Sequence, residues 1–171
     1  TAAGKDPRTF PDKNLIEELK GYHSGGQIGD AGTLNDDIFG LLAFLSAGEP
    51  MSNPAVADAK NFILSNQNPD GGWGFVVGGS SDTNMTAMAM MALVEAGESV
   101  SSGAISRAET YLRAAQNADG GFPYDPTSPF GTNSDASSDA WVISAIEAIG
   151  QNPSSWKSSS GKSPVDHLLS L

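Results

Sequence analysis

Five aspartates stand at or near the expected starts of three apolar segments, and they are the residues of this chain best placed for chemistry. These aspartates are Asp36, Asp37, Asp82, Asp135 and Asp139. Carboxylates at such positions can bind a ligand or a cation, but they also cap helices and stabilise the positive end of the helix dipole. We favour capping, and we keep all five as ligand-binding candidates together with Asn84 and Trp141 on the same segments.

Metal chemistry finds little support in the composition. The sequence contains no cysteine and two histidines, His23 and His167, which we expect at the surface of the terminal units. Zinc prefers nitrogen and sulfur ligands, and the acidic turns at 68–70 and 117–119 lack the spacing of an EF-hand calcium loop. We therefore expect no metal, no cofactor and no disulfide, and we assign no catalytic residue at this point of the sequence.

The segments that position these residues repeat along the chain. Residues 62–73 return as residues 111–122, an offset of 49, and residues 34–49 align with 83–98 at the same offset. A third copy at 136–150 is displaced by 53, because the preceding loop has four extra residues. A period of this length is typical of stacked supersecondary units.

We predict a single α/α repeat domain over residues 1–171. Its units are about 1–49, 50–98 and 99–151, followed by a truncated fourth unit at 152–171. The pattern in each unit predicts two helices. The first has a single apolar stripe, as formed by Val56, Ala59, Phe62 and Ile63, and the second is apolar nearly all round. No alternating strand pattern competes, so we expect an all-α fold without a sheet. The predicted helices are 14–22, 35–47, 54–66, 84–96, 104–116, 137–149 and 164–171.

The turn between the two helices repeats most closely, and it carries a resemblance to a known family. Its residues are Gln67, Gly71, Gly72 and Trp73 in one unit and Gln116, Gly120, Gly121 and Phe122 in the next. With Arg107 and Tyr111 upstream, the second copy resembles the QW repeat of squalene and oxidosqualene cyclases. The first copy departs from that motif at Asp58, where the motif has a basic residue. The chain thus resembles the prenyltransferase and squalene-oxidase repeat superfamily.

That resemblance implies an α/α toroid, with the earlier helix of each unit in an outer ring and the later helix in an inner ring. It also implies that the glutamine and the aromatic residue staple neighbouring units together. A closed ring of this type needs about six helix pairs, so we predict a partial ring of about three and a half units. Its expected partners are the remainder of a longer chain or a second copy bound through the open ends.

The resemblance also indicates where a cyclase would carry its catalytic acid in this sequence. Class II terpene cyclases protonate their substrate from a DxDD motif at the start of an inner helix, where a carboxylic acid is kept protonated by its surroundings. The aligned residues 82–85 read Asp-Thr-Asn-Met, so the amide of Asn84 stands at the proton-donor position. Shifted by one residue, residues 34–37 read Leu-Asn-Asp-Asp, in which the first acid is replaced.

The sequence therefore favours a non-catalytic repeat module for ligand or partner recognition, with an apolar small molecule as one candidate ligand. Two alternatives remain open. One is a fragment of a terpene or squalene cyclase-like enzyme with an incomplete acid motif, and the other is a carrier domain of the cobalamin-binding type.

Composition restricts the partners further. The formal net charge is −11, and phosphate binding depends on clusters of Lys and Arg that this chain lacks, so we expect no nucleic acid partner. No segment approaches the roughly 20 apolar residues needed to cross a bilayer, so we expect no membrane insertion. Loops rich in Ser, Gly, Asn and Thr, low Lys content and the acidic balance favour an extracellular or cell-surface location.

Overall fold

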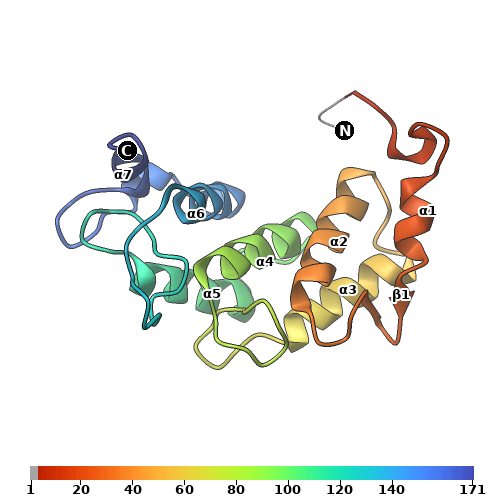
Figure 1. Ribbon diagram of the computed structural model, residues 1–171, viewed down its shortest axis with the longest axis horizontal. Helices are drawn as coiled ribbons and strands as arrows, with labels where there is room; N and C mark the ends of the chain where they lie inside the picture. The colour runs from red at the N-terminus through yellow and green to blue at the C-terminus, as the bar shows by residue number, and fades with distance from the viewer. Residues whose placement is uncertain (1–3) are drawn as a thin grey trace.

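Seven α-helices follow one another along an arc in the computed structural model, which describes residues 4–171 (Figure 1). The apolar segments form α2 (Leu34–Ser46), α4 (Thr83–Glu95) and α6 (Ala136–Ala148). They alternate with α1 (Leu15–Lys20), α3 (Pro54–Ser65), α5 (Gly103–Ala115) and α7 (Pro164–Leu168). Two 3-10 turns precede α1 and α7, namely η1 (Pro7–Thr9) and η2 (Pro153–Ser155). The predicted all-α toroid-type repeat fold is confirmed, and each predicted helix is present.

The expectation that no sheet forms is wrong at one place. Two short strands, β1 (His23–Ser24) and β2 (Gln27–Ile28), pair antiparallel around Gly25 and Gly26. Both glycines have positive φ, +61° and +82°, which suits the tight turn of a two-residue hairpin. Strands of two residues are too short to show an alternating pattern, and so the sequence carried no strand signal.

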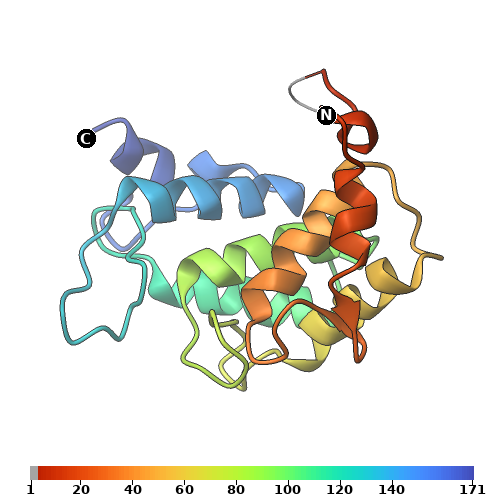
Figure 2. The same cartoon turned by 45° about the vertical axis from the view of Figure 1, so that its right-hand side comes forward.

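The helices are arranged so that each inner helix lies against both helices that follow it. Helix α2 contacts α3 and α4, α4 contacts α5 and α6, and α6 contacts α7. In both ribbon views α4 lies between α2 and α6 (Figures 1 and 2). Nine of the thirteen α4 residues are buried, as expected for a helix that is covered on several sides. No helix among residues 4–171 is both long and apolar enough to cross a membrane.

The outer helices bury one stripe each, as their sequence pattern predicts. In α3 the side chains of Val56, Ala59 and Ile63 are fully buried, whereas Phe62 is half-buried. Asn53 caps this helix by accepting the amide of Ala55 at 3.1 Å, and the proline that follows it needs no hydrogen-bond partner for its nitrogen.

The repeated turn connects each unit to the outer helix of the next one. Gly71 has φ +92°, and a Cβ there would lie 2.6 Å from the carbonyl oxygen of Arg107 on α5. The side-chain amide of Gln67 donates to the carbonyls of Gly71 and Ala104, each at 2.8 Å. Glycine is therefore required both by the backbone conformation and by the close approach of α5.

The second copy of the turn has the same construction. Gln116 donates to the carbonyl of Gly120 at 2.9 Å and to that of Trp156 at 3.1 Å. Gly120 has φ +94°, and a Cβ there would lie 2.6 Å from the carbonyl oxygen of Ser163, at the start of α7. Each glutamine thus spans two units with the two N–H bonds of one amide group.

The aspartate that departs from the repeat motif has a partner of its own. Arg107 donates to the side-chain oxygen of Gln67 in the preceding unit. One repeat earlier, the equivalent residue is Asp58, and its carboxylate lies 2.9 Å from Nε2 of His23 in the β1–β2 hairpin. The link between units is kept, but the residue types differ. In this earlier repeat the outer helix carries the acidic Asp58, and its partner His23 comes from the preceding unit.

Candidate functional site

Two of the five aspartates cap inner helices. Oδ1 of Asp82 accepts the amide of Met85 at 2.7 Å, and Oδ1 of Asp135 accepts the amide of Ser138 at 2.9 Å. These contacts satisfy backbone donors that a helix leaves free in its first turn. Burial raises the pKa of Asp82 to about 6 against the hydrogen bonds that it accepts.

Two more aspartates occupy one repeated position whose role is to bind the backbone of the preceding turn. Asp37, Thr86 and Asp139 are equivalent at the offsets of 49 and 53. Their side-chain oxygens accept the amide of Ile28 at 2.8 Å, of Trp73 at 3.0 Å and of Phe122 at 2.8 Å, respectively. Since a threonine serves as well as an aspartate here, the common requirement is a hydrogen-bond acceptor and not a charge.

Asp37 differs from its equivalents in having a buried oxygen that makes no hydrogen bond. Its side chain is fully buried, and its Oδ2 and the Oε1 of buried Gln27 are without hydrogen-bond partners among the described residues. Burial raises the pKa of Asp37 from an ordinary 3.8 to about 6, against the stabilising hydrogen bond from Ile28. A carboxylate in this place is costly at neutral pH.

Replacing Asp37 with asparagine is therefore expected to stabilise the protein at pH 7 and to have little effect near pH 4. When folding raises the pKa of a group, that group favours the folded state at any pH below its pKa in the unfolded chain. This contribution is lost as the pH rises through its pKa in the folded protein. A shift from 3.8 to about 6 corresponds to an upper limit of about 3 kcal/mol. Urea denaturation from pH 4 to pH 7 measures the difference between the two proteins.

The exposed Asp12 provides the control, since Asp12→Asn removes the same charge from a solvated position. The stabilisation by Asp37→Asn should grow from pH 4 to about pH 6 and then level off. A difference that does not change with pH, or a loss of stability at pH 7, would contradict the assignment of a costly buried carboxylate.

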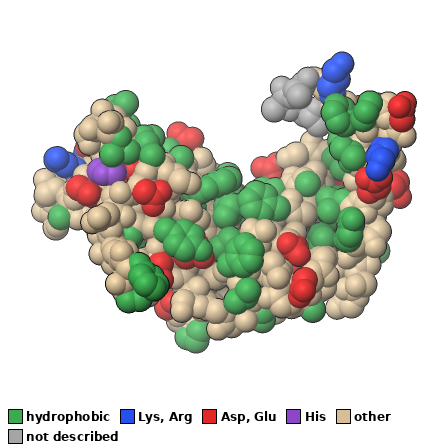
Figure 3. All heavy atoms as spheres, in the orientation of Figure 1, with side chains coloured by type: hydrophobic (Ala, Val, Ile, Leu, Met, Phe, Trp, Pro, Cys, Tyr) green, Lys and Arg blue, Asp and Glu red, His purple; other side chains and the backbone are tan. Residues whose placement is uncertain are grey.

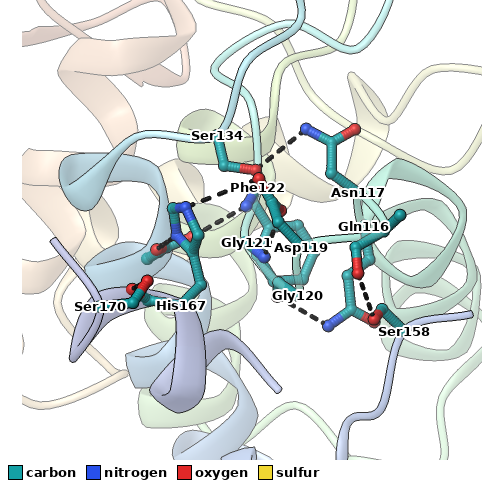
Figure 4. Close-up of polar contacts among 12 residues, drawn as sticks. Gln116, Asn117, Asp119, Gly120, Gly121, Phe122, Ser134, Ser158, His167 and Ser170 are labelled. Carbon is teal, nitrogen blue, oxygen red and sulfur yellow. Dashed lines mark hydrogen bonds and ion pairs between the residues drawn. The ribbon is translucent and has the colours of Figure 1, made fainter. Parts of the chain in front are cut away.

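The surface location expected for His167 is wrong. The His167 side chain (Figure 4) is 8 % exposed. Its Nδ1 lies 2.5 Å from Oδ2 of Asp139, which is fully buried. On the other side of the ring, Nε2 lies 3.6 Å from Oδ2 of Asp119. Burial raises the pKa of Asp139, whereas the hydrogen bond to His167 acts in the opposite direction. The histidine thus joins α7 to α6 and to the repeated turn.

Asp119 is in turn held by the loop before α6. Its Oδ1 accepts the hydroxyl of Ser134 at 2.8 Å and the amide of Gly121 at 3.0 Å (Figure 4). Both imidazole nitrogens of His167 thus face carboxylates. Among residues 4–171 no cluster of three His, Asp or Glu side chains could hold a metal ion.

An aromatic pair bridges the inner helices on the hollowed side of the arc. The rings of Phe39 on α2 and Trp141 on α6 meet edge to face, with centroids 6.4 Å apart and an interplanar angle of 79°. Phe39 is 44 % exposed and Trp141 is half-buried. Figure 3 shows hydrophobic side chains along the floor of this hollow, between the two arms of the molecule. Met88 on α4, which is 5 % exposed, is at the repeat position of Phe39 and Trp141, and we call the surface of these three residues the concave face.

The sequence model of the squalene-hopene cyclase C-terminal domain matches residues 32–131. The chain belongs to this family. The match begins just before α2 and includes both copies of the repeated turn. No curated protein matches the chain.

In this squalene-hopene cyclase C-terminal domain, the predicted site residues do not form one cluster. Asp82 and Asp135 are helix caps, and Asp37 and Asp139 bind backbone amides. Asp36 accepts the amide of Asp30 at 3.2 Å. Asn84, at the proton-donor position of the cyclase motif, is half-buried and has no acidic proton to give.

Sequence reasoning identified Trp141 but missed the residue that it contacts. Phe39 is 102 positions away in the chain and was read as part of an apolar inner helix. Its place in that helix does carry a signal, because Phe39 and Met88 are equivalent at the offset of 49, and Trp141 follows at 53. A bulky apolar residue at the same position of all three inner helices indicates a shared surface.

Proposed function

We propose that this domain is a non-catalytic recognition module that binds an apolar small molecule on its concave face. The observation that carries the proposal is the use of the carboxylates. Asp37, Asp82, Asp135 and Asp139 each accept a backbone amide, as expected for carboxylates that hold the fold together. Asn84 takes the place of the cyclase proton donor.

The surface chemistry supports a neutral apolar ligand. Phe39 and Trp141 offer large ring surfaces with little conformational entropy to lose, and the side chain of Met88 can adapt its shape. Acidic residues near the ends of the inner helices, among them Asp36, Glu95 and Glu147, disfavour anionic ligands. We also propose a secreted or cell-surface location, which the same acidic composition supports.

The alternative is an enzyme of the cyclase type, and membership of the squalene-hopene cyclase C-terminal domain family is what favours it. In that case the proton would come from Asp36 or Asp37, the remaining acids of the incomplete motif. Burial raises the pKa of Asp37, which would suit a proton donor. The side chain is fully buried, however, so a substrate on the concave face would not reach it without rearrangement of α2.

Calorimetric titration with farnesol, a fifteen-carbon isoprenoid alcohol, tests the recognition module. We expect saturable binding that Trp141→Ala weakens by at least about tenfold, equal to about 1.4 kcal/mol. Phe130→Ala is the matched control, because Phe130 is 99 % exposed on a loop and its removal should leave binding unchanged. Ligand binding should also raise the melting temperature, because it stabilises the folded state by mass action.

Two results would count against this proposal. If no binding is found up to about 1 mM farnesol while circular dichroism shows an intact fold, the proposed apolar ligand is ruled out. Conversion of squalene to a cyclic product by the purified chain, abolished by Asp36→Asn or Asp37→Asn, would favour the enzyme instead.

A further inference from the structure

Exposed aromatic side chains occupy one repeated position next to the repeated turn. Phe75 and Tyr124 each follow the buried aromatic residue of that turn by two places. Phe75 is 50 % exposed and Tyr124 is 51 % exposed, and Val76 and Val77 beside Phe75 are exposed as well. Single apolar side chains at a surface need no explanation, but a group that recurs at one repeat position marks an interaction surface.

Contacts between units join these loops into one surface. The carbonyl of Tyr124 accepts the amide of Thr83 at 2.9 Å, so the loop before α6 lies against the start of α4. One unit earlier, the carbonyl of Phe75 accepts the amide of Asn35 at 3.4 Å, at the start of α2. In Figure 2 the loops before α2, α4 and α6 follow one another along the lower left side of the molecule.

The segments that form this surface carry one sign of charge. Residues 28–37, 68–83 and 117–139 contain nine aspartates and no glutamate, lysine or arginine. The rest of the chain is nearly balanced, with eleven acidic and nine basic residues. We call the surface of these three segments the acidic ledge. Among residues 4–171, His167 is the one ion-pair partner that reaches an aspartate of the ledge.

Acidic residues at the opposite ends of the inner helices have basic partners. Glu49, which follows α2, lies 2.7 Å from Arg8 and 2.9 Å from Lys20. Glu98, which follows α4, lies 3.1 Å from Lys60. The excess of acid on the ledge is therefore a local feature and not a general property of this acidic chain. A surface of one sign attracts a partner of the opposite sign.

The distribution of the aspartates favours an extended partner. No group of three His, Asp or Glu side chains in the described part of the chain could hold a metal ion. The aspartates are spread over three units instead, so a partner needs several cations along its length to meet them. Units stack along the arc, and the ledge runs along its side, so a further unit at either end would lengthen the ledge and not cover it.

We propose that the acidic ledge is a docking site for an extended basic segment of a partner protein, in which lysine or arginine alternates with apolar residues. The cations of this segment lie near the exposed Asp30 and Asp70 and the half-buried Asp125. Its apolar side chains pack on Phe75 and Val76. An exposed aromatic ring also attracts a neighbouring cation, which adds to the charge complementarity.

Fluorescence anisotropy with a labelled synthetic peptide tests the ledge. The probe contains four repeats of Lys-Leu-Gly, and four repeats of Glu-Leu-Gly give a control with the same apolar residues and the opposite charge. We expect saturable binding of the lysine peptide to the intact chain and no binding of the glutamate peptide. Binding should weaken as sodium chloride is raised from about 0.05 M to about 0.5 M, because salt screens exposed charges.

Two pairs of substitutions compare the ledge with other surfaces. Val76→Arg places a cation on the ledge, and Val100→Arg makes the same change at an exposed site beyond the C-terminal end of α4. Both variants alter the net charge equally, so the difference between them reports position. Val76→Arg should weaken peptide binding at least about tenfold, and Val100→Arg by less than about twofold.

The second pair removes one ring each. Phe75→Ala should weaken binding about two- to fivefold, because the partner loses a ring to contact. Phe10→Ala should leave binding unchanged, although its ring is 48 % exposed and so resembles Phe75 in exposure. All four substituted side chains are exposed, so each variant should keep the circular dichroism of the unsubstituted protein.

Three results would overturn the proposal. One is absence of peptide binding to the folded protein. Another is equal weakening by Val76→Arg and Val100→Arg, because binding would then follow net charge and not the ledge. The third is self-association in sedimentation equilibrium that Val76→Arg abolishes, because the ledge would then bind a second copy. Farnesol binding on the concave face uses other residues, so the two proposals can fail separately.

Discussion

Replacing Trp73 with alanine is expected to lower the free energy of unfolding by about 3–5 kcal/mol, measured by urea denaturation. The Trp73 side chain is fully buried, and its indole N–H donates to the carbonyl of Ile63 at 2.8 Å. Truncation would leave a cavity between units and remove one of the two hydrogen bonds that the carbonyl of Ile63 accepts, the other coming from the amide of Asn66. The surrounding contacts come from several helices, so the space has little freedom to collapse.

Trp73→Phe separates the two contributions to this loss. Phenylalanine occupies the equivalent position in the next unit as Phe122, which is also fully buried. The ring volume is then largely kept and the hydrogen bond to Ile63 is lost, so we expect a smaller cost of about 1–3 kcal/mol. Phe130→Ala, at a 99 % exposed ring, should change stability by less than about 0.5 kcal/mol. A loss below about 1 kcal/mol for Trp73→Ala would show that the ring is not a structural staple.

Replacing His167 with alanine is expected to cost about 3 kcal/mol or more at pH 7. The variant leaves Asp139 fully buried and without the imidazole that lies 2.5 Å from its Oδ2. Removal of one member of a buried polar pair is costly, because the other member keeps its desolvation penalty. The loss should be largest in the last unit, where hydrogen exchange of the α7 amides should become faster.

The sister unit supplies the matched control for this pair. Thr86 accepts the amide of Trp73 without any histidine, so Asp139→Thr should keep the acceptor for the amide of Phe122. We expect the double variant Asp139→Thr with His167→Ala to be more stable than His167→Ala alone. A double-mutant cycle gives the interaction energy between the two side chains. Equal stability of these two proteins would mean that the histidine acts through packing and not through its contact with Asp139.

The sequence by itself determined the helical repeat, because the interactions that specify it are local. The N-caps at Asn53, Asp82 and Asp135 each act on an amide within three residues. The glycines of the repeated turn act on their own backbone, and the apolar rows follow the helical period. Offsets of 49 and 53 then relate each unit to the one before it, so one correct unit predicts the others.

Tertiary structure alone decided what the aspartates do, because their partners are distant in the chain and differ between units. Asp37, Thr86 and Asp139 occupy one repeated position, yet Asp37 keeps an unpaired oxygen and Asp139 pairs with a histidine 28 residues away. The same holds for the acidic ledge. Its aspartates lie in loops that differ in length between units, and only the contacts between units show that these loops form one surface. Sequence periodicity specifies the face that a helix buries, whereas the neighbours present in space decide which loops share a surface.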